Sequence, residues 1–375
     1  MQLSETLKMY PTEYQKNLIA EAMTEYIHTV NSLVSDAVNG HSIAKTTTAD
    51  VTADLPSALK NQCIRDAKSI VKKHYKACHK AILKNRSLIK RGSAVRVKAP
   101  SLPVLRKPCC YINSQNYKIK DTCIEFPVMV HGKSKRISVP AKLTERQKSL
   151  FSDTKFGTMR IVVKNHTLVA QIVYEVPEPE PKTDGSVMGI DLGIKCPAVS
   201  YCSDGSVKFY GNGRRNKYLR RHYAYLRKKL QTSKKMKAVK RMNDKEQRIM
   251  RDIDHKLSHD IVETAVAHHV KIIKLEQLQN IRSATRRSRK NNHSLHSWSF
   301  YRLAQFIEYK AKLAGISVEY VNPAYTSQKC PICGSVHHAV GRNYTCECGF
   351  RIHRDLLGAM NIENSTEFVD NRQTA

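Results

Sequence analysis

Hydrophobic positions near the start of the chain recur with the period of an α-helix. A strand-like segment, 2–9, comes first. Apolar residues then recur every three or four positions, at Leu18, Ala22, Tyr26, Val30, Leu33 and Ala37. This spacing predicts an amphipathic helix that begins after a capping box of Thr12 and Gln15 and ends at about Val38.

A second helix is predicted to open at Leu55-Pro-Ser57 and to end at about Asn85. Its apolar side holds Leu59, Cys63, Ala67, Ile70 and Cys78, and its other side holds Lys60, Gln62, Arg65, Lys68, Lys72, Lys73 and Lys80. A helix of this kind is either an ordinary solvated surface helix or a surface that contacts nucleic acid. The net charge of the chain favours nucleic-acid contact.

Between 93 and 180 the apolar period changes to that of a β-strand. Alternating segments at 95–98, 136–139, 160–163 and 168–174 predict short strands. We expect a small β-barrel or curled sheet, into which the two helices are inserted. Pro177-Glu-Pro-Glu-Pro-Lys182 then predicts a stiff linker between domains.

Beyond this linker the pattern predicts a three-stranded meander followed by alternating helices and strands. The meander strands are expected at 187–191, 198–202 and 206–210, followed by a very basic helical stretch at 216–269. A buried strand, a helix, another strand and a final helix are expected at 271–275, 300–313, 316–321 and from about 355. This is the element order of an RNase H-like α/β domain.

The charge of the chain narrows the class of partner. Lys and Arg number 64 against 32 Asp and Glu, a net charge of +32, which indicates a polyanionic partner with a long phosphate backbone. An anionic membrane surface is the alternative, but no segment approaches the ~20 apolar residues of a spanning helix. The N-terminus, Met1-Gln-Leu-Ser-Glu5, lacks the pattern of a signal peptide. We therefore expect an intracellular protein.

Three acidic residues stand at the ends of predicted elements. Asp191 and Glu276 each close an apolar strand, and Asp355 opens the last helix. Any one of them could be a helix cap, but three in RNase H order predict a site for two divalent ions ~4 Å apart, for phosphodiester hydrolysis. Oxygen ligands suit Mg²⁺ or Mn²⁺ rather than zinc.

Four of the eleven cysteines form a second candidate site. Cys330-Pro-Ile-Cys333 and Cys346-Glu-Cys348 each precede a glycine, and two such pairs predict one structural Zn²⁺. The single residue between the second pair is tighter than the usual two. One of three histidines could therefore replace a thiolate: His337, His338 or His353. We expect the other seven cysteines to be buried or incidental thiols.

Other residues near these sites allow two interpretations each. His353 and Arg354 either contact the scissile phosphate or cap the cysteine ribbon. The loop after Glu276 either closes over the site or is a solvated loop; its basic residues are Arg286, Arg287, Arg289 and Lys290. Trp298 is more typical of a core than of a base-stacking platform.

Several of these segments together resemble the TnpB family of transposon-encoded, RNA-guided nucleases, relatives of compact type V CRISPR effectors. The motifs are Gly189-Ile-Asp-Leu-Gly193, Ile273-Lys-Leu-Glu-Gln-Leu278, Asn322-Pro-Ala-Tyr-Thr-Ser-Gln-Lys-Cys-Pro-Ile-Cys-Gly334 and His353-Arg-Asp-Leu-Leu-Gly-Ala-Met-Asn361. The opening segment at 7–12 and the helix at 251–258 also match, more loosely. The resemblance covers the entire chain.

This resemblance implies a domain organisation. A β-rich wedge domain would occupy 1–10 and 88–180, and a helical recognition insertion would occupy 11–87. A RuvC-like nuclease domain would occupy 185–325 and 353–375, with a zinc ribbon inserted at 326–352.

The resemblance also implies a function. Asp191, Glu276 and Asp355 would be the catalytic triad of a nuclease that cuts both strands of DNA beside a short adjacent motif. A guide RNA from its own element would pair with the target DNA, and basic helices would follow the heteroduplex by its backbone. Lys60, Gln62 and Arg65 are candidates for reading the adjacent motif. Such a protein would be cytoplasmic and nucleoid-associated in a prokaryotic cell.

Three alternatives remain beside this hypothesis. One is an RNA-guided DNA-binding repressor that has lost cleavage, which the intact triad disfavours. The second is an RNase H-like nuclease that acts without RNA, which leaves the large basic N-terminal half unexplained. The third is a strand-transferring transposase, which the TnpB resemblance disfavours.

Overall fold

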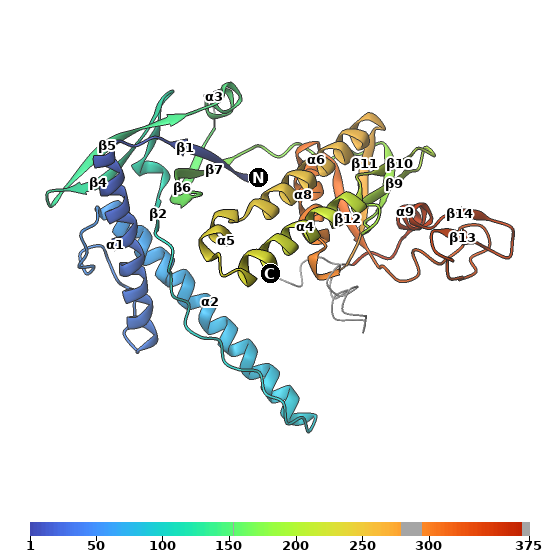
Figure 1. Cartoon of the computed structure of the whole chain (residues 1–375), viewed down its shortest axis with the longest axis horizontal. Helices are drawn as coiled ribbons and strands as arrows, with labels where there is room; N and C mark the ends of the chain where they lie inside the picture. The colour runs from blue at the N-terminus through green and yellow to red at the C-terminus, as the bar shows by residue number, and fades with distance from the viewer. Residues whose placement is uncertain (153, 279–294, 370–375) are drawn as a thin grey trace. The chain divides into compact units, whose positions relative to one another are not determined.

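The chain forms two compact units, Met1–Pro177 and Glu178–Ala375. The structure, a computed structural model, describes residues 1–152, 154–278 and 295–369 (Figure 1). The division falls at the first residue of the segment 177–182, where three prolines alternate with acidic residues.

The first unit is built on a seven-stranded sheet in the order β2-β6-β7-β1-β5-β4-β3. The strands are β1 (Gln2–Met9), β2 (Cys109–Ile112), β3 (Lys118–Ile119), β4 (Cys123–Val130), β5 (Lys133–Lys142), β6 (Phe156–Lys164) and β7 (Thr167–Glu175). All of the ladders are antiparallel. No ladder among the described residues joins β2 to β3, so the sheet is open rather than the closed β-barrel allowed by the sequence pattern.

The helices of this unit are α1 (Glu13–Val38), α2 (Ser57–Lys90), α3 (Glu145–Ser152) and the short 3₁₀ helix η1 (Ser114–Asn116). Of these, α1 and α2 follow β1 as an insertion into the sheet, whereas η1 lies between β2 and β3 and α3 lies between β5 and β6. The capping box is confirmed: the Thr12 hydroxyl accepts from the Gln15 N–H, and the Gln15 side chain accepts from the Thr12 N–H. The apolar face of α1 packs on the sheet, and the ring of Tyr26 on this face is fully buried.

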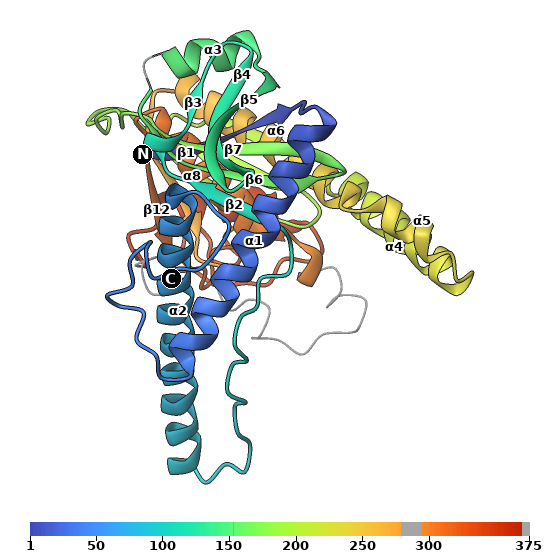
Figure 2. The same ribbon diagram turned by 90° about the vertical axis from the view of Figure 1, so that its left-hand side faces the viewer.

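The second helix extends five residues beyond the predicted end at Asn85. The segment that follows it, expected to contain a strand at 95–98, forms none. It returns along α2 instead (Figure 2), where the Asn85 side chain bonds both the N–H and the C=O of Val97. The alternation of apolar and polar residues at 95–98 therefore predicted a strand wrongly. The Asn85 side-chain amide, rather than a neighbouring strand, bonds the backbone of Val97.

The second unit contains a five-stranded sheet in the order β10-β9-β8-β11-β12. Its strands are β8 (Ser186–Asp191), β9 (Ala198–Cys202), β10 (Val207–Tyr210), β11 (Val270–Glu276) and β12 (Ser317–Val321). β8, β9 and β10 form the predicted antiparallel meander. β8 pairs with β11, and β11 with β12, in parallel.

The helices of this unit are α4 (Gly213–Thr232), α5 (Met236–Met242), α6 (Lys245–Ala267), α8 (Phe300–Leu313) and α9 (Arg354–Asn364). The helices α6, α8 and α9 pack on the sheet, whereas α4 and α5 project from it (Figure 2). Residues 216–269, predicted as one basic helical stretch, thus lie in three helices and end one residue before β11. The apolar run of β11 is buried through Ile273 and Leu275, against Ile261 of α6 and Ile307 of α8. A separate two-stranded ribbon, β13 (Asn343–Thr345) and β14 (Arg351–His353), precedes α9.

Candidate active site

The ends of two parallel strands place two carboxylates side by side. In the β8–β11 ladder, Ile190 is the register partner of Leu275, and the next residue on each strand is acidic: Asp191 and Glu276. Because parallel strands end at the same edge of a sheet, both carboxylates lie at one edge. Both residues are half-buried.

Two glycines allow α9 to lie directly on β8. A Cβ placed on Gly189 would stand 2.2 Å from the Ala359 carbonyl oxygen and 2.4 Å from the Glu363 nitrogen, so only glycine permits this contact between backbones. Gly358 of α9 faces the Asp191 side chain, whose Cγ would lie 3.2 Å from an added Cβ. The helix therefore fits against the acidic end of β8.

This packing brings the third acid to the first two. The N-cap of α9 is His353, whose Nδ1 accepts from the Asp355 N–H at 3.2 Å. Asp355 is the second residue of the helix rather than its cap, and only 6% of it is exposed. His353 thus caps the helix, and its ring also packs edge-on against Phe209 at 5.2 Å between centroids.

The other two carboxylates of the cluster perturb Asp191. Burial, followed by the charges of Glu276 and Asp355, raises the pKa of Asp191 well above its usual range. Burial also raises the pKa of Glu276 to about 7, against the opposing effects of a hydrogen bond from Thr326 and the charge of Arg354. A cluster that holds several buried acids near one another binds a proton or a cation more readily than an exposed carboxylate does.

Partner residues that the sequence did not single out hold these acids in place. The Thr326 hydroxyl donates to Glu276 Oε1, and the Asn361 side chain of α9 donates to the carbonyls of Thr326 and Lys329 at 2.7 and 2.8 Å. Arg342, from the cysteine ribbon, pairs with Asp355. Thr326 and Asn361 lie inside motifs that resemble the TnpB family, so their position in these motifs could have indicated a role. Nothing in the sequence indicated a role for Arg342.

The donor set of this cluster fits divalent cations. It offers three carboxylates from three different elements and no sulfur or imidazole ligand, which suits hard ions such as Mg²⁺ or Mn²⁺. Burial is the main cause of the raised pKa values of Asp191 and Glu276. The charge of a bound divalent ion would favour the ionised form of both carboxyl groups.

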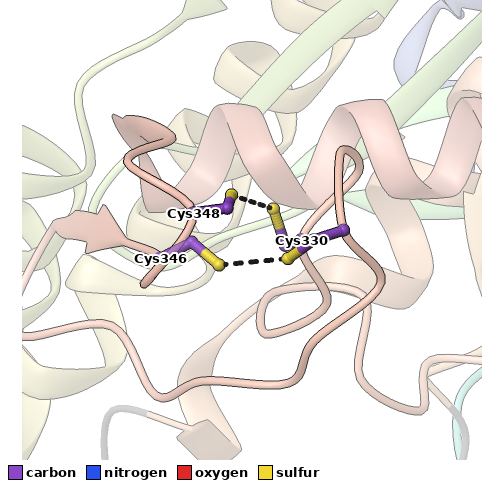
Figure 3. Close-up of side chains that lie close together, drawn as sticks. Cys330, Cys346 and Cys348 are labelled. Carbon is purple, nitrogen blue, oxygen red and sulfur yellow. Dashed lines mark hydrogen bonds between the residues drawn. The ribbon is translucent and has the colours of Figure 1, made fainter.

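The four ribbon cysteines form a second cluster, of which Figure 3 labels Cys330, Cys346 and Cys348. Their sulfurs all lie within 4.8 Å of one another, with Cys330 3.7 Å from Cys348 and Cys333 3.4 Å from Cys346. A Zn–S bond of ~2.3 Å in a tetrahedron requires sulfurs about 3.8 Å apart, so the arrangement fits one Zn²⁺.

Each cysteine pair lies in a turn that is closed by the following glycine, over five residues for the first pair and four for the second. The Gly334 N–H donates to the Cys330 carbonyl, and the Gly349 N–H donates to the Cys346 carbonyl, each at 3.0 Å. Both glycines have positive φ, 73° and 92°, which favours glycine. Among the described residues the cluster holds the four cysteines and no histidine. Hydrogen bonds from the side chain and the backbone N–H of Ser335 lower the pKa of Cys333 to about 6, toward the thiolate that zinc binds.

The candidate motif-reading residues do not share one exposed face. Gln62 is buried, with 5% of its surface exposed, and Lys60 donates to the Val51 carbonyl at 2.9 Å. Of the three, Arg65 alone is exposed. The periodicity of apolar residues in α2 could not show that the segment before this helix, which contains Val51, contacts one side of it.

The remaining candidates have mixed outcomes. Arg354 is exposed beside the acids and donates to the Ser327 hydroxyl at 3.3 Å. Trp298 packs against the core of the second unit, next to Phe300 at 5.1 Å between centroids. The basic loop residues 286, 287, 289 and 290 lie outside the described residues. Within the described ranges, no helix is long and apolar enough to cross a membrane.

Two family models match separate segments of the chain. Residues 171–282 match the family described as "Probable transposase" (OrfB_IS605), and residues 300–362 match "Cas12f1-like, TNB domain". In fold, the chain is similar to a Cas12f1 solved as a complex with sgRNA and target DNA, with a TM-score of 0.58 and 13% identity over 97% of this chain and 99% of that one.

Two curated relatives resemble the chain in sequence. The Cas12f1 endodeoxyribonuclease of Sulfoacidibacillus thermotolerans is 30% identical over 205 residues, but the match spans only 47% of that protein. The TnpB-like protein of Methanocaldococcus jannaschii is 30% identical over 250 residues, which cover 63% of this chain and 88% of the relative. A match of this identity over most of the relative shows that the chain belongs to the TnpB family.

Proposed function

We propose that this protein is an RNA-guided, metal-dependent endonuclease that cuts double-stranded DNA beside a short adjacent motif with one RuvC-like active site. The observation that carries the proposal is the convergence of Asp191, Glu276 and Asp355 from β8, β11 and α9. The Cas12f1 relative named as an endodeoxyribonuclease supports the same reaction.

The second unit would be the nuclease. This domain would occupy 185–325 and 353–375. Its elements are those expected of an RNase H-like domain: a meander, two parallel strands and a final helix that carries the third acid. The zinc ribbon, 326–352, would be inserted between the last strand and that helix. In the first unit, the sheet of 1–10 and 88–180 would be the wedge domain, and 11–87 the recognition insertion.

In the active site, the three carboxylates would hold the Mg²⁺ ions. When bound, such ions activate a water molecule and stabilise the leaving oxygen of the phosphodiester. Thr326 fixes the orientation of Glu276 through its hydroxyl group. The exposed guanidinium of Arg354 is placed to bind the phosphate that enters the site.

The guide and the target would account for the net charge of the chain. An RNA–DNA heteroduplex is recognised through its backbone, which requires Lys and Arg over a large surface rather than a code for each base. The net charge of +32 is spread over both units. Arg65, exposed on α2, stays a candidate for contact with the DNA beside the guide-matched sequence.

The test starts from the RNA that the protein binds. The chain would be expressed with its own flanking genomic DNA and purified, and the RNA that copurifies would be sequenced. One abundant RNA that ends just beyond the gene supports the proposal and supplies the guide. Heterogeneous cellular RNA would remove the guide from the function.

The guide then allows a cleavage assay on plasmids that carry a matching target beside a randomised flank. We expect cutting of both strands with Mg²⁺ and none with EDTA, with a mismatched target, or with Asp191→Ala. The Asp191→Ala protein should still copurify with the RNA. Nicking of one strand by this variant would contradict a single active site for both strands.

A further inference from the structure

The exposed face of α4 carries aromatic rings that the core does not use. Tyr218 and Tyr225 are 65% and 62% exposed and lie seven residues apart, which is two helical turns and about 10 Å along one face. The apolar side of α4 is formed instead by other residues, which are half-buried: Leu219, Tyr223, Leu226 and Leu230. Helix packing therefore does not explain the two exposed rings.

A neighbouring ring extends this aromatic surface. The Tyr218 ring stacks on His222, one turn along, with 5.9 Å between centroids and an interplanar angle of 21°. His222 is exposed as well. Flat rings held in this way on a helix offer faces on which planar groups can stack.

Positive charge borders the rings on both sides. Arg221 and Lys228 flank Tyr218 and Tyr225 on one side, and Lys229 lies on the other; all three are exposed. The helix from Gly213 to Thr232 contains no acidic residue. In the described part of the chain, Arg227 is the one residue of α4 in an ion pair, with Glu246.

The helix also begins beside the acidic cluster. Gly213, its first residue, donates its N–H to the Lys195 carbonyl at 3.1 Å. A Cβ on Gly213 would lie 2.1 Å from the Ile194 carbonyl oxygen. Ile194 and Lys195 lie three and four residues after Asp191, in the connection between β8 and β9. The face therefore runs away from the active site, on helices that project from the sheet (Figure 2).

We propose that this face of α4 binds single-stranded DNA whose bases stack on Tyr218 and Tyr225. Arg221, Lys228 and Lys229 hold its phosphates. Regularly spaced aromatic rings between basic residues are the chemistry that binds single strands without reading sequence. In a base-paired strand the base faces are covered by neighbouring bases, so the rings select unpaired DNA. The surface would guide such a strand toward Asp191, which rests on the proposed nuclease function.

The test uses the full-length protein with its copurified RNA, in EDTA so that no strand is cut. A short single-stranded DNA that carries 5-iodouracil is bound and irradiated, and mass spectrometry locates the cross-links. We expect cross-links at Tyr218 and Tyr225. Each Tyr→Ala substitution should weaken single-strand binding about tenfold, as lost base–aromatic stacking does. Tyr→Phe should bind like the unsubstituted protein.

A matched control is Tyr14→Ala, an equally exposed tyrosine (58%) on α1, which should leave the affinity unchanged. Equal affinity of the double Tyr218→Ala, Tyr225→Ala variant and the parent would overturn the inference. So would cross-links at these tyrosines to an RNA of the same sequence that carries 5-iodouracil, with none to the DNA. Because the assay needs no cleavage, an inactive protein that still cross-links through α4 would contradict the proposed nuclease and not the DNA-binding face.

Discussion

At the scale of single residues, the active site concentrates like charges that the fold alone does not neutralise. Asp191 and Glu276 lie side by side at the ends of parallel strands, and Asp355 stands at the start of the helix packed against one of them. Arg342 pairs with Asp355, but burial still raises the pKa of the other two. The metal-free protein should therefore be less stable than the same fold without these charges.

This strain predicts a pH-dependent effect of Glu276→Gln. The native pKa of Glu276, about 7, lies above the model-peptide value of 4.5. Between these values the native state holds more protons than the unfolded state, so stability falls as the pH rises from 4.5 to 7. The loss is about 3 kcal/mol at most, and glutamine avoids it.

The measurement is thermal unfolding in EDTA at pH 5 and pH 8. We expect Glu276→Gln and the parent to have similar Tm values at pH 5, and the variant to be more stable at pH 8. Mg²⁺ should raise the Tm of the parent at pH 8 and that of the variant much less. A variant less stable than the parent at pH 8 would show that the carboxylate is not strained.

Thr326→Val tests the hydroxyl that holds Glu276. Valine keeps the shape of threonine but removes the donor, so the pKa of Glu276 should rise further and Mg²⁺ should bind about 10- to 100-fold more weakly, as for other residues that orient metal ligands. Thr326→Ser is the matched control, because it keeps the hydroxyl group. Mg²⁺ titration by calorimetry at pH 7 measures the difference, and equal affinities for valine and serine would rule out this role.

Residue-scale predictions from the sequence succeeded where a residue closes a regular element. Asp191 and Glu276 could be placed because their strands were readable as apolar runs of known direction. The positions of Thr326 and Arg342 could not be predicted in this way. Their contacts depend on how the cysteine ribbon, and the residues just before it, pack against the sheet. The helix that carries Gln62 was predicted correctly, but Gln62 is buried rather than on the exposed side of that helix.

At the scale of elements, the position of the third acid depends on how closely α9 approaches β8. Gly189 and Gly358 lie on the two sides of this contact. At Gly189 the obstacle to a side chain is backbone, which cannot move without shifting the helix. At Gly358 the obstacle is the Asp191 carboxyl group, which can rotate.

We predict that these two glycines respond differently to alanine. Gly189→Ala should cost about 3 kcal/mol or more of folding free energy, because the added methyl group overlaps the α9 backbone. Gly358→Ala should change stability by less than about 1 kcal/mol, since alanine favours the helix by a similar amount, yet should lower cleavage by displacing Asp191. Chemical denaturation and cleavage rates separate the two effects. Equal destabilisation by both substitutions would contradict this account of the contact.

Element boundaries were most predictable where a local signal marked them. The Thr12–Gln15 capping box fixed the start of α1, and the predicted helix at 300–313 matches α8 residue for residue. The sequence did not reveal β4, whose residues Ile124, Phe126 and Val128 face the core beside a buried Pro127, because proline argues against an inner strand. The sequence also could not show that the first sheet is open rather than closed into a barrel, since strand pairing depends on residues far apart in the chain.

At the scale of the whole molecule, the ribbon that carries the four cysteines and the acidic cluster are connected within the second unit. Arg342 lies between the two cysteine pairs and reaches Asp355, while Thr326, at the root of the ribbon, reaches Glu276. The ribbon has its own small core, formed by Tyr344, Cys346 and Leu357 together with Cys330. A core of this size cannot hold its shape without the metal.

Loss of zinc should therefore disable the active site without unfolding the rest of the chain. In Cys346→Ala we expect the bound zinc to be lost and cleavage to fall about 10- to 100-fold, because the partners of Asp355 and Glu276 are no longer positioned. The first unit has its own core, so binding of the copurified RNA and most of the far-ultraviolet circular dichroism should persist. Cys123→Ala, a half-buried thiol of the first unit, is the control and should keep both zinc and cleavage. Full cleavage by a zinc-free Cys346→Ala protein would separate the ribbon from catalysis and leave Arg342 and Thr326 without the positioning roles argued for them.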